Sequence, residues 1–422
     1  MRRSLAAAAI SLLPGIALAA GVRTWNGPLT LAQAVTRAEE AGFQVQAARD
    51  AAEVSSAQAA AVRSTLLPQM GLSATTMNGG ITQLGMPVAQ QNYVSANVTV
   101  PLFEPSAFAS ARGAERTALA AESDAGQAMS DAMLAAVQAY ENALLARAIY
   151  EARVTTVSYE RRHLHDVGIM VKGGALPRYA FAESQAAFEQ AVQSEQDAAA
   201  QRDETMNDLK VVLALDLRSS VSLAEPLRVL PMNGAEAAFL ARAASSRPDI
   251  TAAQSRVDAA RAHVDAARAA YLPTIAASAQ TYNGNSRPYL GNHGYQVGVS
   301  VSLPIIDSGS RAAAFHVARA SLASAKVMLD QARLSAQRDV ANAWREYEAA
   351  AVDLRSARAE EMAARQTLRI TMLRERSGKG ITLETLDALA QDAAAREGVL
   401  RAITRLDIAV ATVHHAAGDT SL

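Results

Sequence analysis

Residues 93–105 read Tyr93-Val94-Ser95-Ala96-Asn97-Val98-Thr99-Val100-Pro101-Leu102-Phe103-Glu104-Pro105. From Val94 to Leu102 every second residue is apolar, and the residues between them up to Thr99 are polar, which predicts a strand with one apolar and one polar face. Its length is close to the roughly 9 to 11 residues that a tilted strand needs to cross a bilayer. The period then changes at Glu104-Pro105, where a proline stands at the expected first position of a helix. A strand followed at once by a helix is the unit from which we expect the fold to be built.

This unit occurs twice, about 200 residues apart. The landmark pairs are Leu67-Pro68 with Leu272-Pro273, Val100-Pro101-Leu102-Phe103 with Leu303-Pro304-Ile305-Ile306, and Gly174 with Gly380. A period this long is not that of a solenoid, so each copy should be half of one pseudo-symmetric domain.

Four strands are expected, two in each copy. The segments 93–102 and 295–303 alternate cleanly, while their upstream partners 69–77 and 274–282 alternate less well but follow a Leu-Pro. Segments 78–92 and 283–294 are rich in Gly, Asn, Gln and Pro and read as hairpin loops. Tyrosines near the strand ends, Tyr93, Tyr282 and Tyr295 among them, suggest interfacial girdles.

Four strands cannot cross a membrane alone, because their open edges would leave backbone groups unpaired in hydrocarbon. Other copies of the chain must therefore close a β-barrel of eight, twelve or sixteen strands, and the strand pattern alone does not choose among them. The competing interpretation is a soluble sandwich, which would require a second sheet over the apolar face.

Very long helices are expected after each second strand. Nothing interrupts a helical pattern from about 105 to 165 or from about 310 to 376, and each helix would be on the order of 100 Å long. In the second copy an apolar seam of three-and-four spacing, including Leu322, Leu329, Val340 and Leu354, is typical of coiled-coil packing. Further helices are expected at 31–66, 178–214, 249–271 and 383–416, with an irregular connection and one short helix at 215–248.

The chain begins like an exported protein. Arg2-Arg3, an apolar stretch from Leu5 to Ile16 and small residues up to Ala19 read as a signal peptide at 1–19. There is no cysteine for a disulfide or a lipid anchor, and the formal net charge of −1 gives no reason to expect nucleic acid. No phosphate loop, nucleophile motif or metal cluster is recognisable, so we expect no enzyme, no cofactor and no metal.

In order and spacing, these features resemble the TolC-like outer-membrane efflux protein family. The resemblance is carried by the landmarks above together with Leu29-Thr30-Leu31, Arg247-Pro248-Asp249-Ile250, Asp307 with Gly309, and Thr382-Leu383-Glu384-Thr385-Leu386-Asp387-Ala388. It implies a mainly helical fold with a small β-barrel portion, closed by trimerisation into twelve strands and a twelve-helix periplasmic tunnel. It further implies a passive exit duct in the outer membrane of a Gram-negative bacterium, joined by a periplasmic adaptor to an inner-membrane pump. The two repeats would be 20–214 and 249–422, with 215–248 as an equatorial connection.

The resemblance also assigns site residues. Glu384 and Asp387, three apart on one helix face, would ring the periplasmic entrance, although on spacing alone they are ordinary acids at a helix start. The family's tyrosine and arginine that hold the entrance shut correspond here to Glu375 and Gly380, so the closing contacts must differ, with Lys379 a possible substitute. The adaptor would touch the two helical turns, at Val167, Gly168, Gly173, Gly174, Gly378, Lys379 and Gly380. The barrel–helix junctions would be Pro68, Pro101, Pro273 and Pro304.

Two other questions stay open from the sequence. His163 and His165 point apart on a helix, and we expect exposed side chains rather than a metal site. A periplasmic coiled-coil adaptor or structural protein would also be exported and helical, although neither explains duplicated strands. The sequence does not indicate whether the substrates are drugs, metals or proteins. It also does not indicate which class of pump drives them.

Overall fold

The computed structural model describes residues 23–77, 91–284, 293–377 and 379–419. The expected signal peptide at 1–19, Gly378 and most of both hairpin loops lie outside these residues. The strands are β1 Asn26–Leu29, β2 Gln69–Met77, β3 Gln91–Phe103, β4 Ser220–Leu223, β5 Thr274–Gly284 and β6 His293–Ser302. The helices are α1 Leu31–Ala41, α2 Phe43–Ser64, α3 Pro105–Lys172, α4 Arg178–Val212, α5 Glu236–Ser246, α6 Pro248–Ala269, α7 Ser310–Arg376 and α8 Thr382–Ala416. Helix, hairpin, long helix and shorter helix thus follow one another twice.

The four predicted strands form one antiparallel sheet in the order β2-β3-β5-β6. The two hairpins meet where β3 pairs with β5, so the sheet joins the halves of the chain. Within the described residues β2 and β6 each have one strand neighbour, which leaves two open edges.

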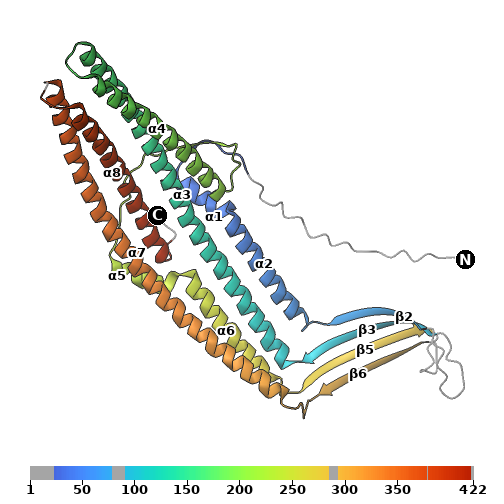
Figure 1. Cartoon of the computed structure of the whole chain (residues 1–422). Helices are drawn as coiled ribbons and strands as arrows, with labels where there is room; N and C mark the ends of the chain where they lie inside the picture. The colour runs from blue at the N-terminus through green and yellow to red at the C-terminus, as the bar shows by residue number, and fades with distance from the viewer. Residues whose placement is uncertain (1–22, 78–90, 285–292, 378, 420–422) are drawn as a thin grey trace, which may run out of the picture.

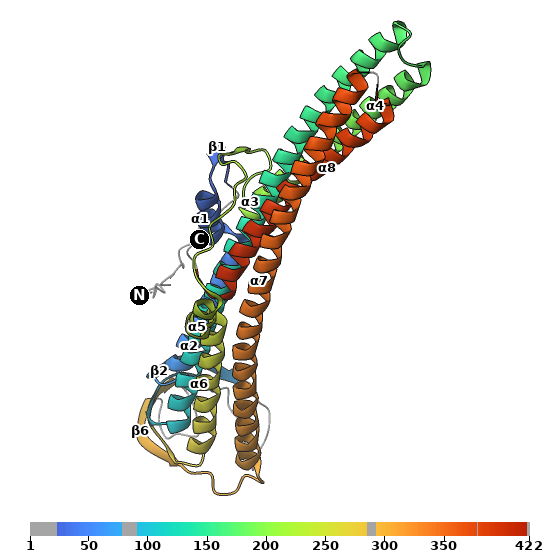
Figure 2. The same ribbon diagram turned by 90° about the vertical axis from the view of Figure 1, so that its left-hand side faces the viewer.

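The helices form a long, gently curved layer that continues from the sheet (Figures 1 and 2). Near the sheet the packing order is α2, α3, α6, α7, the same order as the strands to which these helices connect. Toward the far end α4 and α8 replace α2 and α6 beside the two long helices. Along most of its length the subunit therefore presents four helices side by side. In the part of the chain that the structure describes, no helix combines the length and apolar character needed to cross a membrane.

The helix predicted at 31–66 is two helices, because the chain bends at Gly42. A Cβ there would lie 2.6 Å from the Ala38 carbonyl oxygen, so only glycine fits this turn. Helix α1 begins at Leu31, as predicted, after a capping box. In this box the side chains of Thr30 and Gln33 each accept a hydrogen bond from the other residue's backbone N–H group. The parallel pair β1–β4 was also absent from the sequence prediction, since four-residue strands carry too little pattern.

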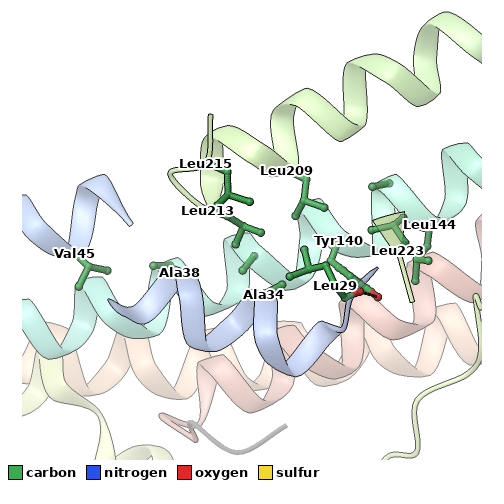
Figure 3. Close-up of a cluster of buried hydrophobic side chains, with 13 residues drawn as sticks. Leu29, Ala34, Ala38, Val45, Tyr140, Leu144, Leu209, Leu213, Leu215 and Leu223 are labelled. Carbon is green, nitrogen blue, oxygen red and sulfur yellow. Dashed lines mark hydrogen bonds between the residues drawn. The ribbon is translucent and has the colours of Figure 1, made fainter. Parts of the chain in front are cut away.

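The main apolar core of the first half lies where α1, α3, the end of α4 and β4 meet (Figure 3). Tyr140 of α3 is fully buried there and donates a hydrogen bond of 3.0 Å from its hydroxyl to the Leu29 carbonyl. In the second half the predicted seam of α7 is confirmed, with Leu329, Val340 and Leu354 all buried in its contacts with neighbouring helices.

Candidate functional site

The sheet has one apolar face. Directly opposed residues of an antiparallel sheet lie on the same side, and the register places Met70, Val98, Ala279 and Val297 in one row. Along the edge strand β6, Val297, Val299 and Val301 are each 66% exposed or more. Uncovered aliphatic side chains in continuous rows are typical of an interaction surface rather than of a face meeting water.

The opposite face is polar. Gly71, Asn97, Gln280 and Gln296 form one row across the four strands. Ser73 and Ser95 form another part of this face and join their hydroxyls at 2.7 Å. This separation of character is the one that the alternation at 93–102 predicts.

The tyrosines correct one expectation. Tyr295 opposes Thr281 on the apolar face, as a girdle residue would, but Tyr282 opposes Gly294 and Ser95 on the polar face. Tyr93, two residues before Ser95, shares that polar face. A tyrosine's position near a strand end therefore does not determine which face of the sheet it lies on. The register of strand pairing determines that.

Three of the four junction prolines lie between a helix and a strand: Pro68 before β2, Pro273 before β5, and Pro304 between β6 and α7. Pro101 instead lies inside β3, where the register with β5 shifts between Pro101 and Phe103. This bulge places Phe103 opposite Ile275, on the apolar face.

The start of α7 is capped as its sequence suggests. Asp307 accepts hydrogen bonds from the backbone N–H groups of Gly309 at 3.2 Å and Arg311 at 2.8 Å. The same carboxylate accepts from Arg311 Nε at 2.7 Å. Asp307 thus satisfies the N–H group of Arg311 in the first turn of α7, just after the strand ends.

The turn between α3 and α4 lies at the end of the molecule remote from the sheet (Figure 1). Gly173 closes α3, and Gly174 has φ +74°, a conformation that favours glycine. Gly168 lies within α3. Val167 is buried at 1% exposure, so it cannot be a partner contact, which corrects its place among the turn residues.

The equivalent turn between α7 and α8 is closed by Arg374, which sequence reasoning missed. Its carbonyl accepts from the N–H groups of Lys379 at 2.9 Å and Gly380 at 3.1 Å. Its guanidinium lies 3.5 Å from the Glu384 carboxylate, which joins the end of α7 to the first turn of α8. Glu384 and Asp387 are both exposed on the first turns of α8. A basic residue before a glycine turn and an acid after it was the available signal.

The side chain of His163 is only 9% exposed, whereas an exposed side chain was expected. Its Nδ1 lies 3.9 Å from the buried Glu375 carboxylate of α7, which couples the far ends of the two long helices. Burial lowers the pKa of His163, an effect that Glu375 and Asp166 partly oppose. A histidine at a helix end reads as exposed in sequence because nothing local shows that Glu375 of α7 will lie beside it.

A second pair of ionisable residues lies between α3 and α8, and both of its members are buried. Glu141 of α3 is 4% exposed and Asp407 of α8 is fully buried, and burial is the main cause that raises the pKa of Glu141 to about 7 and that of Asp407 to about 6. The negative charge of Asp407 adds to the shift at Glu141. Asp407 Oδ1 accepts from the Leu230 N–H at 2.7 Å, which holds the connecting segment against α8.

Among the described residues there is no group of three or more His, Cys, Asp or Glu side chains arranged to hold a metal ion. His414 and His415 contact Asp419 and Asp131 respectively. The candidate site consists of three surfaces: the apolar face of the sheet, its polar face, and the exposed charged turns at the end remote from the sheet.

Comparisons with known proteins agree with this geometry. A sequence model of the outer membrane efflux protein family matches residues 34–215 and 239–419. Comparison with curated protein sequences gives no significant match.

Three solved channels show the same fold. The CmeC outer membrane channel of Campylobacter jejuni has a TM-score of 0.80 at 18% identity and covers 92% of this chain and 85% of its own. The open state of the MtrE outer membrane channel of Neisseria gonorrhoeae has a TM-score of 0.77 at 24% identity. The match covers 92% of this chain and 89% of MtrE. The VceC outer membrane protein of Vibrio cholerae has a TM-score of 0.78 at 18% identity. The match covers 92% of this chain and 96% of VceC.

Proposed function

The chain belongs to the outer membrane efflux protein family, and we propose that three copies of it close into one continuous conduit of twelve strands and twelve helices. The family match confirms the resemblance, an efflux protein of the outer membrane, and the mainly helical fold expected from the sequence is that of the solved channels. The trimer, the conducting path and the contacts with an adaptor and an inner-membrane pump are the substance of the proposal.

The observation that carries it is the matched order of strands and helices. Each subunit presents four strands over four helices in one curved layer, with the two sheet edges open. Because the strands alternate in direction, β6 of one copy would lie antiparallel to β2 of the next. Pairing these edges satisfies the backbone groups that hydrocarbon cannot.

The two faces of the sheet then acquire roles. The apolar rows would meet lipid, and the row with Asn97 and Gln296 would line the lumen. The family comprises efflux channels rather than enzymes, and we propose a passive duct without catalytic activity, driven by the pump.

The far end would be the periplasmic entrance. Glu384 and Asp387 from three copies would bring six carboxylates to the mouth and favour cations. The exposed turns around Gly173 and Lys379 would receive the adaptor. The bond between Arg374 and Glu384 is a contact that opening of the α7–α8 pair could break.

In this arrangement the signal peptide 1–19 is removed on export. Residues 20–214 and 249–422 each supply two strands and their helices, while 215–248 forms a belt around the middle of the tunnel. The short pair β1–β4 lies in this belt region and ties the start of the chain to the connection.

The proposal is tested by expression in a strain that lacks its own outer-membrane efflux channel but keeps the pump and adaptor, with dye accumulation and single-channel conductance as measurements. Val299→Arg should abolish outer-membrane insertion, since a charge on the lipid face costs about 2 to 4 kcal/mol at mid-bilayer. Its neighbour Ser300→Arg, on the polar face, should insert normally. Purification as a detergent-free soluble monomer would exclude the duct.

A further inference from the structure

A groove of about 560 Å³ lies between α3 and the C-terminal part of α4, and we call it the equatorial groove. Its lining combines aliphatic and polar side chains. The aliphatic residues are Ala135, Ala139, Leu145, Ala146, Ile149 and Val212, and the polar ones are Gln138, Asn142, Gln201, Thr205 and Asp208. The volume falls in the range of roughly 300 to 1,000 Å³ that is usual for sites of small molecules.

The equatorial groove faces away from α1 and the β1–β4 pair. These elements stand on one side of the helical layer (Figure 2), and Tyr140 of α3 enters the apolar core on that side. Gln138 and Asn142 lie two positions before and after Tyr140, and two positions on an α-helix turn a side chain by about 200°. They therefore point to the opposite side of the layer. If the connection at 215–248 surrounds the tunnel as proposed, this opposite side is the lumen.

The floor of the groove is part of the rigid scaffold. Ala139 of α3 and Val212 of α4 line the groove and also pack against the apolar core of the first half. Alanine at three of the six aliphatic positions leaves space that larger side chains would fill. The shape of the groove is thus set by two packed helices and not by a loop.

One carboxylate in the groove is uncompensated. Asp208 is exposed and forms no ion pair or hydrogen bond within the described residues. The nearest basic residues of α4 have other partners: Arg202 pairs with Asp203 at 2.8 Å, and Lys210 donates to the Leu217 carbonyl at 2.9 Å. Over its whole length α4 carries seven acidic and three basic side chains. The groove therefore attracts a positive group and repels a negative one.

The other polar side chains can orient a ligand. The side-chain amides of Gln138, Asn142 and Gln201 form no hydrogen bond in the part of the chain that the structure describes. Each amide offers two donors and an acceptor. A few polar groups around an aliphatic floor are the usual composition of a small-molecule site.

We propose that the equatorial groove binds an amphipathic organic cation, a molecule with a flat apolar body and one protonated amine. The amine would pair with Asp208, and the apolar body would lie over Leu145 and Ile149. The inference rests on the proposed function, which makes this side of the layer a lumen, and it deepens that function by naming a class of substrate. A site on an exit path must also release its occupant, so we expect weak binding.

The experiment uses the absence of cysteine in the sequence, which allows a single thiol to be placed in the groove. Ala135→Cys, at a lining position, is alkylated with an uncharged maleimide in the full-length protein in lipid nanodiscs. The probes are 9-aminoacridine, a flat cation at neutral pH, and acridine-9-carboxylate, an anion with the same ring system. We expect the cation to slow alkylation in a saturable manner and the anion to leave the rate unchanged.

Two matched variants locate the effect. Asp208→Asn should raise the concentration of 9-aminoacridine needed for protection by about fivefold, the ratio expected for one partly exposed ion pair. Asp197→Asn makes the same change at an exposed position of α4 outside the groove and should leave that concentration unaltered. A thiol at Ala200→Cys, also exposed on α4 and outside the groove, should react at the same rate with and without either dye.

Four outcomes overturn the inference: no protection by the cation, equal protection by both dyes, equal effects of Asp208→Asn and Asp197→Asn, or a thiol at Ala135→Cys that does not react because another copy covers it. Single-channel conductance of the same protein separates the two proposals. Conductance without protection removes only the groove assignment, whereas absence of conductance removes the duct itself.

Discussion

The buried carboxyl pair between α3 and α8 makes stability depend on pH in an unusual direction. Burial and the neighbouring charges of Asp407 and Glu225 raise the pKa of Glu141 from 4.5 to about 7, against the opposing effect of Arg228. The folded chain therefore keeps a proton on Glu141 where the unfolded chain has lost it. Stability is full below the unfolded pKa and is lost as the pH rises from about 4.5 through about 7.

The magnitude follows from the shift. At about 1.4 kcal/mol for each pH unit, the folded protein should lose about 3 kcal/mol across this window. Glu141→Gln keeps the shape of the side chain and removes its charge, so we expect a gain of about 2 to 3 kcal/mol at pH 8 and little change at pH 4.5. For a chain of this size that gain corresponds to about 2 to 4 °C in thermal midpoint.

The assay is thermal unfolding followed by circular dichroism in detergent from pH 4.5 to pH 8. Glu122→Gln, an exposed glutamate on the same helix, is the control and should change stability by less than about 0.5 kcal/mol. Asp407→Asn should also flatten the pH dependence, since it removes a charge that raises the pKa of Glu141. If Glu141→Gln keeps the wild-type slope between pH 5 and 8, the assignment of this dependence to Glu141 is wrong.

Three further predictions concern the entrance, the core and the turns. Glu384→Ala with Asp387→Ala should raise single-channel conductance and weaken cation selectivity in planar bilayers; unchanged selectivity would place these acids away from the entrance. Tyr140→Phe should cost about 1 kcal/mol in urea unfolding, because it removes a buried hydrogen bond to the Leu29 carbonyl, which keeps only its bond from the Ala224 N–H, and a neutral effect would show that the bond is not formed in solution. Gly380→Ala should speed amide hydrogen exchange at the α7–α8 turn, since its Cβ would lie 3.0 Å from a backbone nitrogen, whereas Gly398→Ala, with no atom within 4 Å, should stabilise α8 by about 0.5 to 1 kcal/mol. Equal exchange at the turn in both variants would contradict the close approach seen at Gly380.

Much of the architecture was predictable because its signals are local and repeated. Alternation at 93–102 determined a two-faced strand, Pro105 determined where the following helix begins, and a helical pattern without a breaking residue determined the length of α7. These patterns depend on the periods of backbone geometry, which hold whatever the chain packs against. Because the unit is duplicated, each of these weak patterns occurs in both halves of the chain, and each occurrence supports the other.

Only the tertiary structure decided which side chains share an environment. Tyr282 and Tyr295 lie at the same end of one hairpin, but strand register sends them to opposite faces. Glu141 looks like an ordinary exposed glutamate in sequence, yet it is 4% exposed in α3, which packs against α6 and α8 of the other half of the chain. Burial depends on segments far apart in the chain, so no local period encodes it.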